Sequence, residues 1–167
     1  MKFTVLGSGS TGNTVLICTE KTKILVDAGL SAKEILRRLA LVGVDSSDLD
    51  AVLITHEHSD HASGLRVLLN TVKCPVFMSG ETLEAYLREK SNKNNNEPQK
   101  RADALKNRLI EIESSRDFCI GEIDFEPFSV PHDAADNFGF VAKHAGVRLA
   151  TVTDLGHLTT LVKQKLQ

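Results

Sequence analysis

The amino-acid sequence predicts a mixed α/β fold in one domain spanning residues 1–167. Short apolar runs bounded by glycine, proline or polar residues recur from Phe3 to Val152, and this pattern is typical of buried strands. Between some of these runs, apolar residues repeat at helical spacing, as in the segment 31–42. The chain has 167 residues, 41% of them hydrophobic, and is therefore long enough to bury a core of ordinary size.

Charge and cysteine content limit the kinds of partner and the cell compartment that we expect for the protein. The net charge of -2 gives no global attraction to nucleic acid or to an anionic membrane. The N-terminal apolar run is too short for a signal peptide or a membrane span, so we expect a cytoplasmic protein without membrane association. Cys18, Cys74 and Cys119 are odd in number and far apart, which favours buried thiols over a disulfide framework.

The N-terminal part predicts three strands, over residues 3–6, 14–18 and 23–26. The loop 7–13 between the first two is rich in glycine, but it lacks the lysine and the following helix of a P-loop. A tight turn is therefore favoured over a phosphate cradle. Asp27 ends the third strand, where it could either terminate a turn or orient a metal-bound histidine.

The segment 31–42 predicts the first helix, because Ser31 and Glu34 form a capping-box pattern ahead of an apolar stripe. The same criteria predict the remaining elements, which are strands over 51–54, 76–78, 109–112, 123–128, 138–142 and 148–152, a short helix over 65–69, a helix from 79 and a C-terminal helix over 160–166.

Residues 91–108 differ from the rest in having few apolar residues and no clear period. We expect a flexible insertion here. The segment is also basic, with five cations, at Lys93, Lys100, Arg101, Lys106 and Arg108, against two carboxylates, at Glu97 and Asp103. A solvated linker is favoured, and contact with the phosphate backbone of a nucleic acid is the alternative.

The densest polar cluster follows the apolar run 51–54. It contains three histidines and two carboxylates, at His56, Glu57, His58, Asp60 and His61. Buried imidazole and carboxylate groups are costly unless they are hydrogen-bonded or bind metal, so this cluster predicts a metal site. His56 and His58 are two residues apart, a spacing that fits a turning loop and not one face of a helix.

Two later strand ends carry the same residue types. His132 and Asp133 follow one predicted strand, and Asp154 and His157 follow another. Functional side chains commonly lie on loops at the ends of a rigid sheet, so we expect these residues near the first cluster. We predict that His157 supports the site without binding metal and that His144 lies exposed in a hairpin turn.

The run T-H-E-H-S-D-H at 55–61 resembles the H-x-H-x-D-H signature of the metallo-β-lactamase superfamily. Longer matches extend over almost the whole chain and resemble the WalJ (YycJ) DNA-exonuclease subfamily; they are G-S-G-S-T-G-N, V-D-A-G-L-S, V-P-H-D-A-A-D and V-T-D-L-G-H. The resemblance implies an αββα sandwich that stops before its last strand and helix.

The resemblance also implies a set of ligands for two divalent ions, zinc or manganese. These are His56, His58 and His132 for the first ion and Asp60, His61 and Asp154 for the second. Asp154 would be able to bridge both ions. Asp60 would also be the catalytic residue, orienting a metal-bound hydroxide, and Asp27 would orient one of the histidines from behind.

The implied activity is that of a dinuclear phosphodiesterase, a 5′-to-3′ exonuclease with DNA as its substrate. In similar proteins a histidine further along the chain completes the second metal site, so we expect that site to be incomplete, with weak turnover and self-association through an uncovered apolar face. Two alternatives remain open. One is a metal-binding module without turnover, and the other is a hydrolase of RNA, a small cyclic phosphodiester or a thioester.

Overall fold

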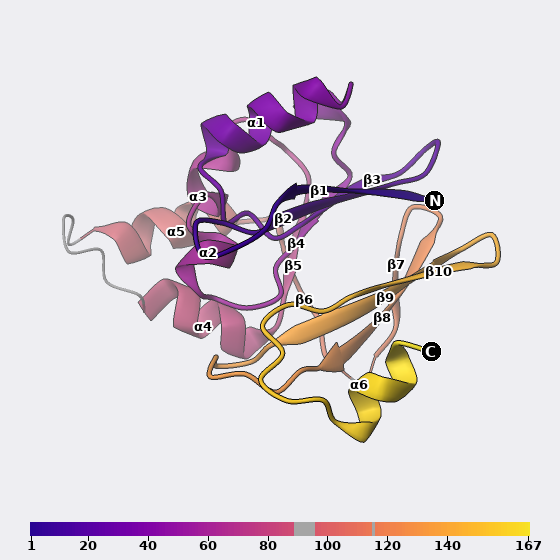
Figure 1. Cartoon of the computed structure of the whole chain (residues 1–167). Coiled ribbons are helices and arrows are strands. Elements are labelled where there is room, and N and C mark those ends of the chain that lie inside the picture. The colour runs from indigo at the N-terminus through magenta and orange to yellow at the C-terminus, as the bar shows by residue number, and fades with distance from the viewer. Residues whose placement is uncertain (89–95, 115) are drawn as a thin grey trace.

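The computed structural model describes residues 1–88, 96–114 and 116–167 (Figure 1). Two β-sheets face each other. Helices α1 to α5 cover the outer side of the first sheet, and α6 covers the outer side of the second. The layers therefore follow the order α, β, β, α, which confirms the predicted mixed α/β sandwich.

The first sheet has its strands in sequence order, and its bounds agree closely with the predicted runs. The strands are β1 (Lys2–Gly7), β2 (Thr14–Cys18), β3 (Lys23–Val26), β4 (Ala51–Leu53), β5 (Val76–Met78) and β6 (Leu109–Glu111). From β1 to β3 the pairing is antiparallel, and from β3 to β6 it is parallel. Parallel neighbours end at the same edge of a sheet, so the residues after β3 and β4 lie side by side.

The helical layer packs on this sheet through a cluster of aliphatic side chains contributed by both. The helical layer consists of α1 (Ala32–Leu41), α2 (Ser59–Ala62), α3 (Leu65–Leu68), α4 (Gly80–Arg88) and α5 (Glu97–Leu105), together with a 3-10 turn at Ser46–Asp48. Helix α1 begins as predicted, because the Ser31 hydroxyl accepts a hydrogen bond from the Glu34 backbone amide. None of the described helices is both long and apolar enough to span a membrane.

The second sheet is antiparallel, in the order β10-β9-β8-β7. Its strands are β7 (Phe118–Ile120), β8 (Ile123–Ser129), β9 (Phe138–His144) and β10 (Val147–Thr151). Phenylalanines such as Phe125 and Phe140 fill the space between the two sheets. On the outer face, α6 (Thr160–Lys165) buries Val162 against Phe128 and Val141. The three-residue strand β7 was not predicted.

The structure corrects the prediction of a flexible loop over 91–108. Residues 91–95 lie outside the described residues, but α5 occupies most of the remainder. The Arg101 guanidinium lies 4.4 Å from the centroid of the Tyr86 ring, and Leu105 is buried. Packing of this kind orders a segment whose composition alone resembles a linker.

Two smaller predictions were also wrong. The three cysteines are free, but Cys74 alone among them is a buried thiol, since Cys18 is half-buried and Cys119 is exposed. His144 is the last residue of β9 and is only partly exposed, because its Nδ1 atom lies 2.9 Å from the carbonyl oxygen of Glu122. Neither Cys119 nor His144 lies in the polar cluster after β4.

Candidate metal centre

The segment after β4 combines a loop with a single helical turn. His56 and His58 lie in a loop, as predicted, with His58 as the N-cap of α2. Asp60 and His61 lie within α2, so the predicted loop is shorter than expected. The helical turn closes because the His58 carbonyl accepts hydrogen bonds from the amides of His61 and Ala62, at 2.9 and 3.0 Å.

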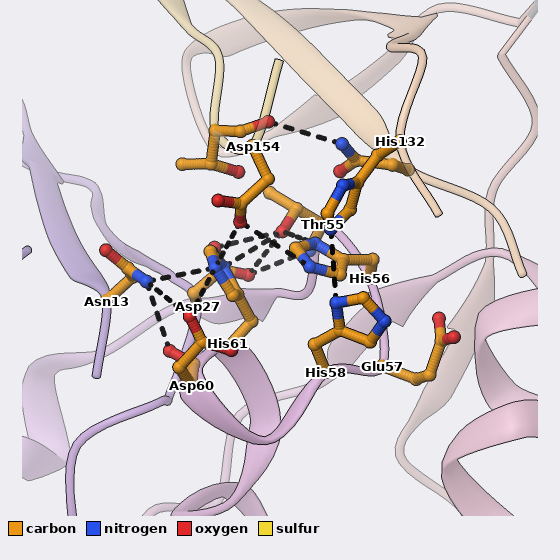
Figure 2. A network of polar contacts seen from close by, with 12 residues as sticks. Asn13, Asp27, Thr55, His56, Glu57, His58, Asp60, His61, His132 and Asp154 are labelled. Atoms are coloured by element: carbon orange, nitrogen blue, oxygen red, sulfur yellow. Dashed lines mark hydrogen bonds and ion pairs between the residues drawn. The ribbon is translucent and has the colours of Figure 1, made fainter. Parts of the chain in front are cut away.

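Three imidazoles form a first group at the edge of the sheet, made by His56, His58 and His132 (Figure 2). Their ring centroids lie 4.8 to 4.9 Å apart, and one ligand atom from each lies within 4.8 Å of the others. The Nε2 atom of His132 is 3.1 Å from Nδ1 of His58. Three nitrogen donors that converge in this way could hold one metal ion.

The orientation of His56 follows from its neighbours. Its Nδ1 atom lies 3.0 Å from the Thr55 hydroxyl, which in turn lies 3.0 Å from both carboxylate oxygens of Asp27. If Nδ1 donates to Thr55 and Thr55 donates to Asp27, the Nε2 lone pair of His56 faces the other histidines. That Nε2 atom is buried and has no hydrogen-bond partner among the described residues, a position suited to a metal ion.

A second group shares His56 and adds His61 and Asp154. The Oδ2 atom of Asp154 lies 2.6 Å from Nε2 of His61 and 3.6 Å from Nε2 of His56. The carboxylate of Asp60 borders this group, with Oδ2 3.5 Å from Nε2 of His61. The structure thus brings all six predicted ligands together, with Asp154 placed between the two histidines and Asp60 at the rim.

Asp27 holds His61 from behind. Its Oδ2 atom lies 2.7 Å from Nδ1 of His61, and its Oδ1 atom accepts the Thr55 backbone amide at 2.8 Å. Asp27 is buried and has a φ of 62°, a left-handed conformation that aspartate tolerates better than most residues. Asp154 likewise has a φ of 50°. Both carboxylates are therefore held in a strained backbone next to the candidate site.

The electrostatics of His56 and His61 differ. Burial, followed by the charges of His61, His58 and His132, lowers the pKa of His56 to about 3, so its imidazole is neutral. Burial also disfavours the charged form of His61. For His61, however, the hydrogen bond and charge of Asp27, together with the charges of Asp154 and Asp60, outweigh burial and raise the pKa of the imidazole. The carboxylates of Asp154 and Asp60 thus place negative charge beside Nε2 of His61, which favours a positive charge at this position.

Asn13, which the sequence did not single out, completes the rim. Its Oδ1 atom accepts the Gly9 backbone amide at 2.9 Å, which fixes the orientation of the amide. Its Nδ2 atom then faces Nε2 of His61 at 2.9 Å and Oδ2 of Asp60 at 3.3 Å. The only signal for Asn13 in the sequence was its place at the end of the glycine-rich loop. Because this loop carries Asn13 to the site, it serves as more than a tight turn.

Gly29 allows the end of β3 to touch α2. A Cβ atom at this position would lie 1.6 Å from the carbonyl oxygen of Asp60. Two backbone hydrogen bonds close the contact, from Asn13 to the Asp60 carbonyl at 2.7 Å and from Ala28 to the His61 carbonyl at 2.8 Å. Side chains of Asp60 and His61 are therefore positioned by main-chain contacts to a different part of the chain.

Polar contacts also fix the segments that carry His132 and Asp154. Nδ1 of His132 lies 2.9 Å from a carboxylate oxygen of Asp133, so its Nε2 atom faces His58. Asn137 donates to the carbonyl of Thr153 at 3.2 Å and so fixes the backbone just before Asp154. His157 is exposed and is not a member of either candidate group in the described chain.

Comparison with known proteins agrees with this geometry. Residues 7–159 match the Metallo-beta-lactamase superfamily. Exodeoxyribonuclease WalJ of Streptococcus pneumoniae is 39% identical over 133 residues, 80% of this chain and 46% of the relative. Exodeoxyribonuclease YycJ of Bacillus anthracis is 34% identical over 163 residues, 98% of this chain and 58% of the relative. The chain therefore spans about half the length of these two relatives.

Among solved structures, the short form of human tRNase Z superposes with a TM-score of 0.68, covering 99% of this chain and 74% of that one. At 18% sequence identity this likeness shows the fold alone. The family match, in contrast, extends over both candidate ligand groups. The chain belongs to the metallo-β-lactamase superfamily, whose members bind divalent metal ions.

Proposed function

We propose that the protein is a metal-dependent phosphodiesterase that acts on DNA as an exonuclease. One observation carries the proposal, namely that five ligand-type side chains from three distant segments converge in two groups that share His56, with Asp60 at the rim. The choice of DNA is supported by the exodeoxyribonuclease relatives, which align with most of the chain.

The donors present suit divalent metal ions. The first group offers three imidazole nitrogens and leaves a coordination position open, which is typical of zinc in hydrolases. The second group combines the imidazoles of His56 and His61 with the carboxylate of Asp154, and Asp60 borders it; such a mixed set accepts zinc or manganese. We propose two ions, with the first bound more tightly because it has the greater number of nitrogen donors and the orphaned Nε2 atom of His56.

Two ions bound together would lower the pKa of water and neutralise charge on the phosphoryl oxygens. The residues of the chain hold the reacting groups. Asp60, steadied by the amide of Asn13, can accept a hydrogen bond from a water molecule in the site and orient it toward phosphorus. Asp27 keeps the proton of His61 on Nδ1, so that Nε2 presents its lone pair to the site.

The test measures metal content and hydrolysis on the same protein. The wild-type chain, the His58→Ala variant and the control variant His144→Ala are each titrated with zinc and with manganese, and the bound metal is determined by mass spectrometry. We expect His58→Ala to lose the first ion and His144→Ala to retain it. An unchanged metal content in His58→Ala would reject the assignment.

Hydrolysis is then followed on 5′-phosphorylated DNA, on RNA of the same sequence and on a cyclic dinucleotide. Faster cleavage of DNA supports the proposed substrate. Equal or faster cleavage of RNA, or of the cyclic compound, would keep the metal chemistry but overturn the choice of DNA. In Asp60→Asn we expect the first ion to be retained and hydrolysis to be lost, since the orienting carboxylate is absent.

A further inference from the structure

A basic cavity of about 440 Å³ lies outside the metal centre, where α3 and the turn after it meet α5. We call it the basic pocket. Five cations line it and Asp103 is the one carboxylate among its lining residues; the cations are Arg66, Lys73, Lys100, Lys106 and Arg108. The whole chain has a net charge of -2, so this concentration of positive charge is local.

Most of this charge is not compensated. Arg108 is held by hydrogen bonds from Nη1 to the carbonyl oxygens of Leu69 and Val72, both at 2.8 Å. These carbonyls fix the guanidinium without neutralising it. Lysines 73, 100 and 106 are exposed and form no ion pair within the described part of the chain, whereas Arg66 is paired with Glu97 at 2.6 Å. At least four cations with one carboxylate therefore face the cavity.

The basic pocket is assembled by the fold and not by a run of sequence. Arg66 lies on α3 and Lys73 follows it. Lys100 lies on α5, and Lys106 and Arg108 follow α5. Helix α3 packs beside α5, which brings these segments together (Figure 1). Arg101, which belonged to the predicted basic segment, instead packs over the ring of Tyr86 and is only 9% exposed.

The basic pocket is connected to the metal centre by one nearly continuous helical segment. Asp60 and His61 lie on α2, α3 follows directly, and both Ser63 and Gly64 between them have right-handed helical backbone. The metal ligands follow β4, whereas Lys73 and Arg108 precede β5 and β6, so the two sites lie at opposite ends of this segment. A nucleic acid that contacts both would have to run along the helical layer between them.

We propose that the basic pocket binds the phosphate backbone of the nucleic acid that is cleaved at the metal centre, at a distance from the scissile bond. The proposal rests on the proposed function. The lining of the basic pocket favours a polyanion over an apolar ligand, since Leu69 and Ala104 are the two apolar residues in it. Several closely spaced cations in a concave surface match a ligand with charges at regular intervals.

The test compares two triple variants with the same change in charge. K73Q/K100Q/K106Q removes the exposed lysines of the basic pocket, and K21Q/K33Q/K163Q removes three exposed lysines elsewhere. Binding of a fluorescent single-stranded DNA is measured by anisotropy at several salt concentrations, with a chelator present to prevent cleavage. Three lost phosphate contacts should lower the log-log salt slope by about 2 in the first variant, at about 0.7 per contact, and by much less in the control.

Equal slopes in the two variants would overturn the proposal. So would an unchanged DNA slope accompanied by lost binding to vesicles of anionic phospholipid in K73Q/K100Q/K106Q, which would make a lipid surface the ligand. Hydrolysis of bis(p-nitrophenyl) phosphate by the wild-type chain, with zinc added, reports the metal centre separately, because this diester is too small to reach both places. A lower salt slope in K73Q/K100Q/K106Q, without hydrolysis of this diester by the wild-type chain, would support DNA binding at the basic pocket and reject the proposed function.

Discussion

The two sides of the candidate metal centre are supported very differently. His61 is fully buried, with a carboxylate within 2.7 Å of each ring nitrogen. His58 and His132 are partly exposed and lie against each other, and the carboxylate behind His132 belongs to Asp133, whose side chain is 89% exposed. The fold therefore organises the His61 side by buried hydrogen bonds. On the other side, the fold brings imidazoles together and leaves their alignment to a bound cation.

His56 belongs to both sides, so its loss should have the largest effect. In His56→Ala both candidate groups lose a nitrogen donor, and we expect the bound metal to fall to near zero after dialysis. Mass spectrometry of the purified protein measures this, with His144→Ala as the control. If the variant keeps one ion with unchanged affinity, the two groups do not share this residue.

Asp27→Asn tests the buried support of His61. The new amide would direct an N–H group at Nδ1 of His61, which moves the proton of the ring to Nε2 and removes the lone pair from the site. Metal affinity at the second group should fall by about 10- to 100-fold, while the first group retains its ion. Competition with a chromophoric chelator resolves the two affinities, and an equal loss at both would remove the distinction between the two sides.

Gly29→Ala tests the backbone support of the same side. Because the added methyl group would overlap the Asp60 carbonyl, α2 must shift and the free energy of unfolding should fall by about 1–3 kcal/mol. Denaturant unfolding of the metal-free protein measures it. Gly80→Ala is the matched control, since a Cβ there would meet the nearest atom at an ordinary 3.4 Å. Equal stability of the two variants would show that the contact between β3 and α2 is looser than described.

Asp133→Asn should have the smallest effect, although this carboxylate contacts a histidine just as Asp27 does. Its exposure leaves the contact screened by water, and such pairs contribute about 0–1 kcal/mol. We expect affinity at the first group to fall by less than about fivefold in the same chelator competition. A loss as large as that of Asp27→Asn would mean that metal binding orders the loop of His132 and buries this carboxylate.

Local sequence pattern was sufficient to predict much of the secondary structure and part of the candidate site. The strand runs, the cap of α1 at Ser31 and the cluster after β4 were all predicted from residues that are close in sequence. A strand shows its burial in its own side chains, and a cluster of histidines and carboxylates is too costly to be accidental packing. The mixed α/β class and the polar cluster after β4 could therefore be inferred from local pattern. The αββα sandwich and the set of six ligands were implied by the resemblance to the metallo-β-lactamase superfamily.

Contacts between distant segments were decided only by the tertiary structure. The amide of Asn13 faces His61 because a loop packs on α2, and Arg101 packs over Tyr86 because α5 lies beside α4. The basic pocket likewise combines cations from two separate segments. Sequence spacing gives the direction of a side chain within its own element. Which elements touch depends on the summed packing of the whole chain, including close approaches such as that of Gly29 to Asp60.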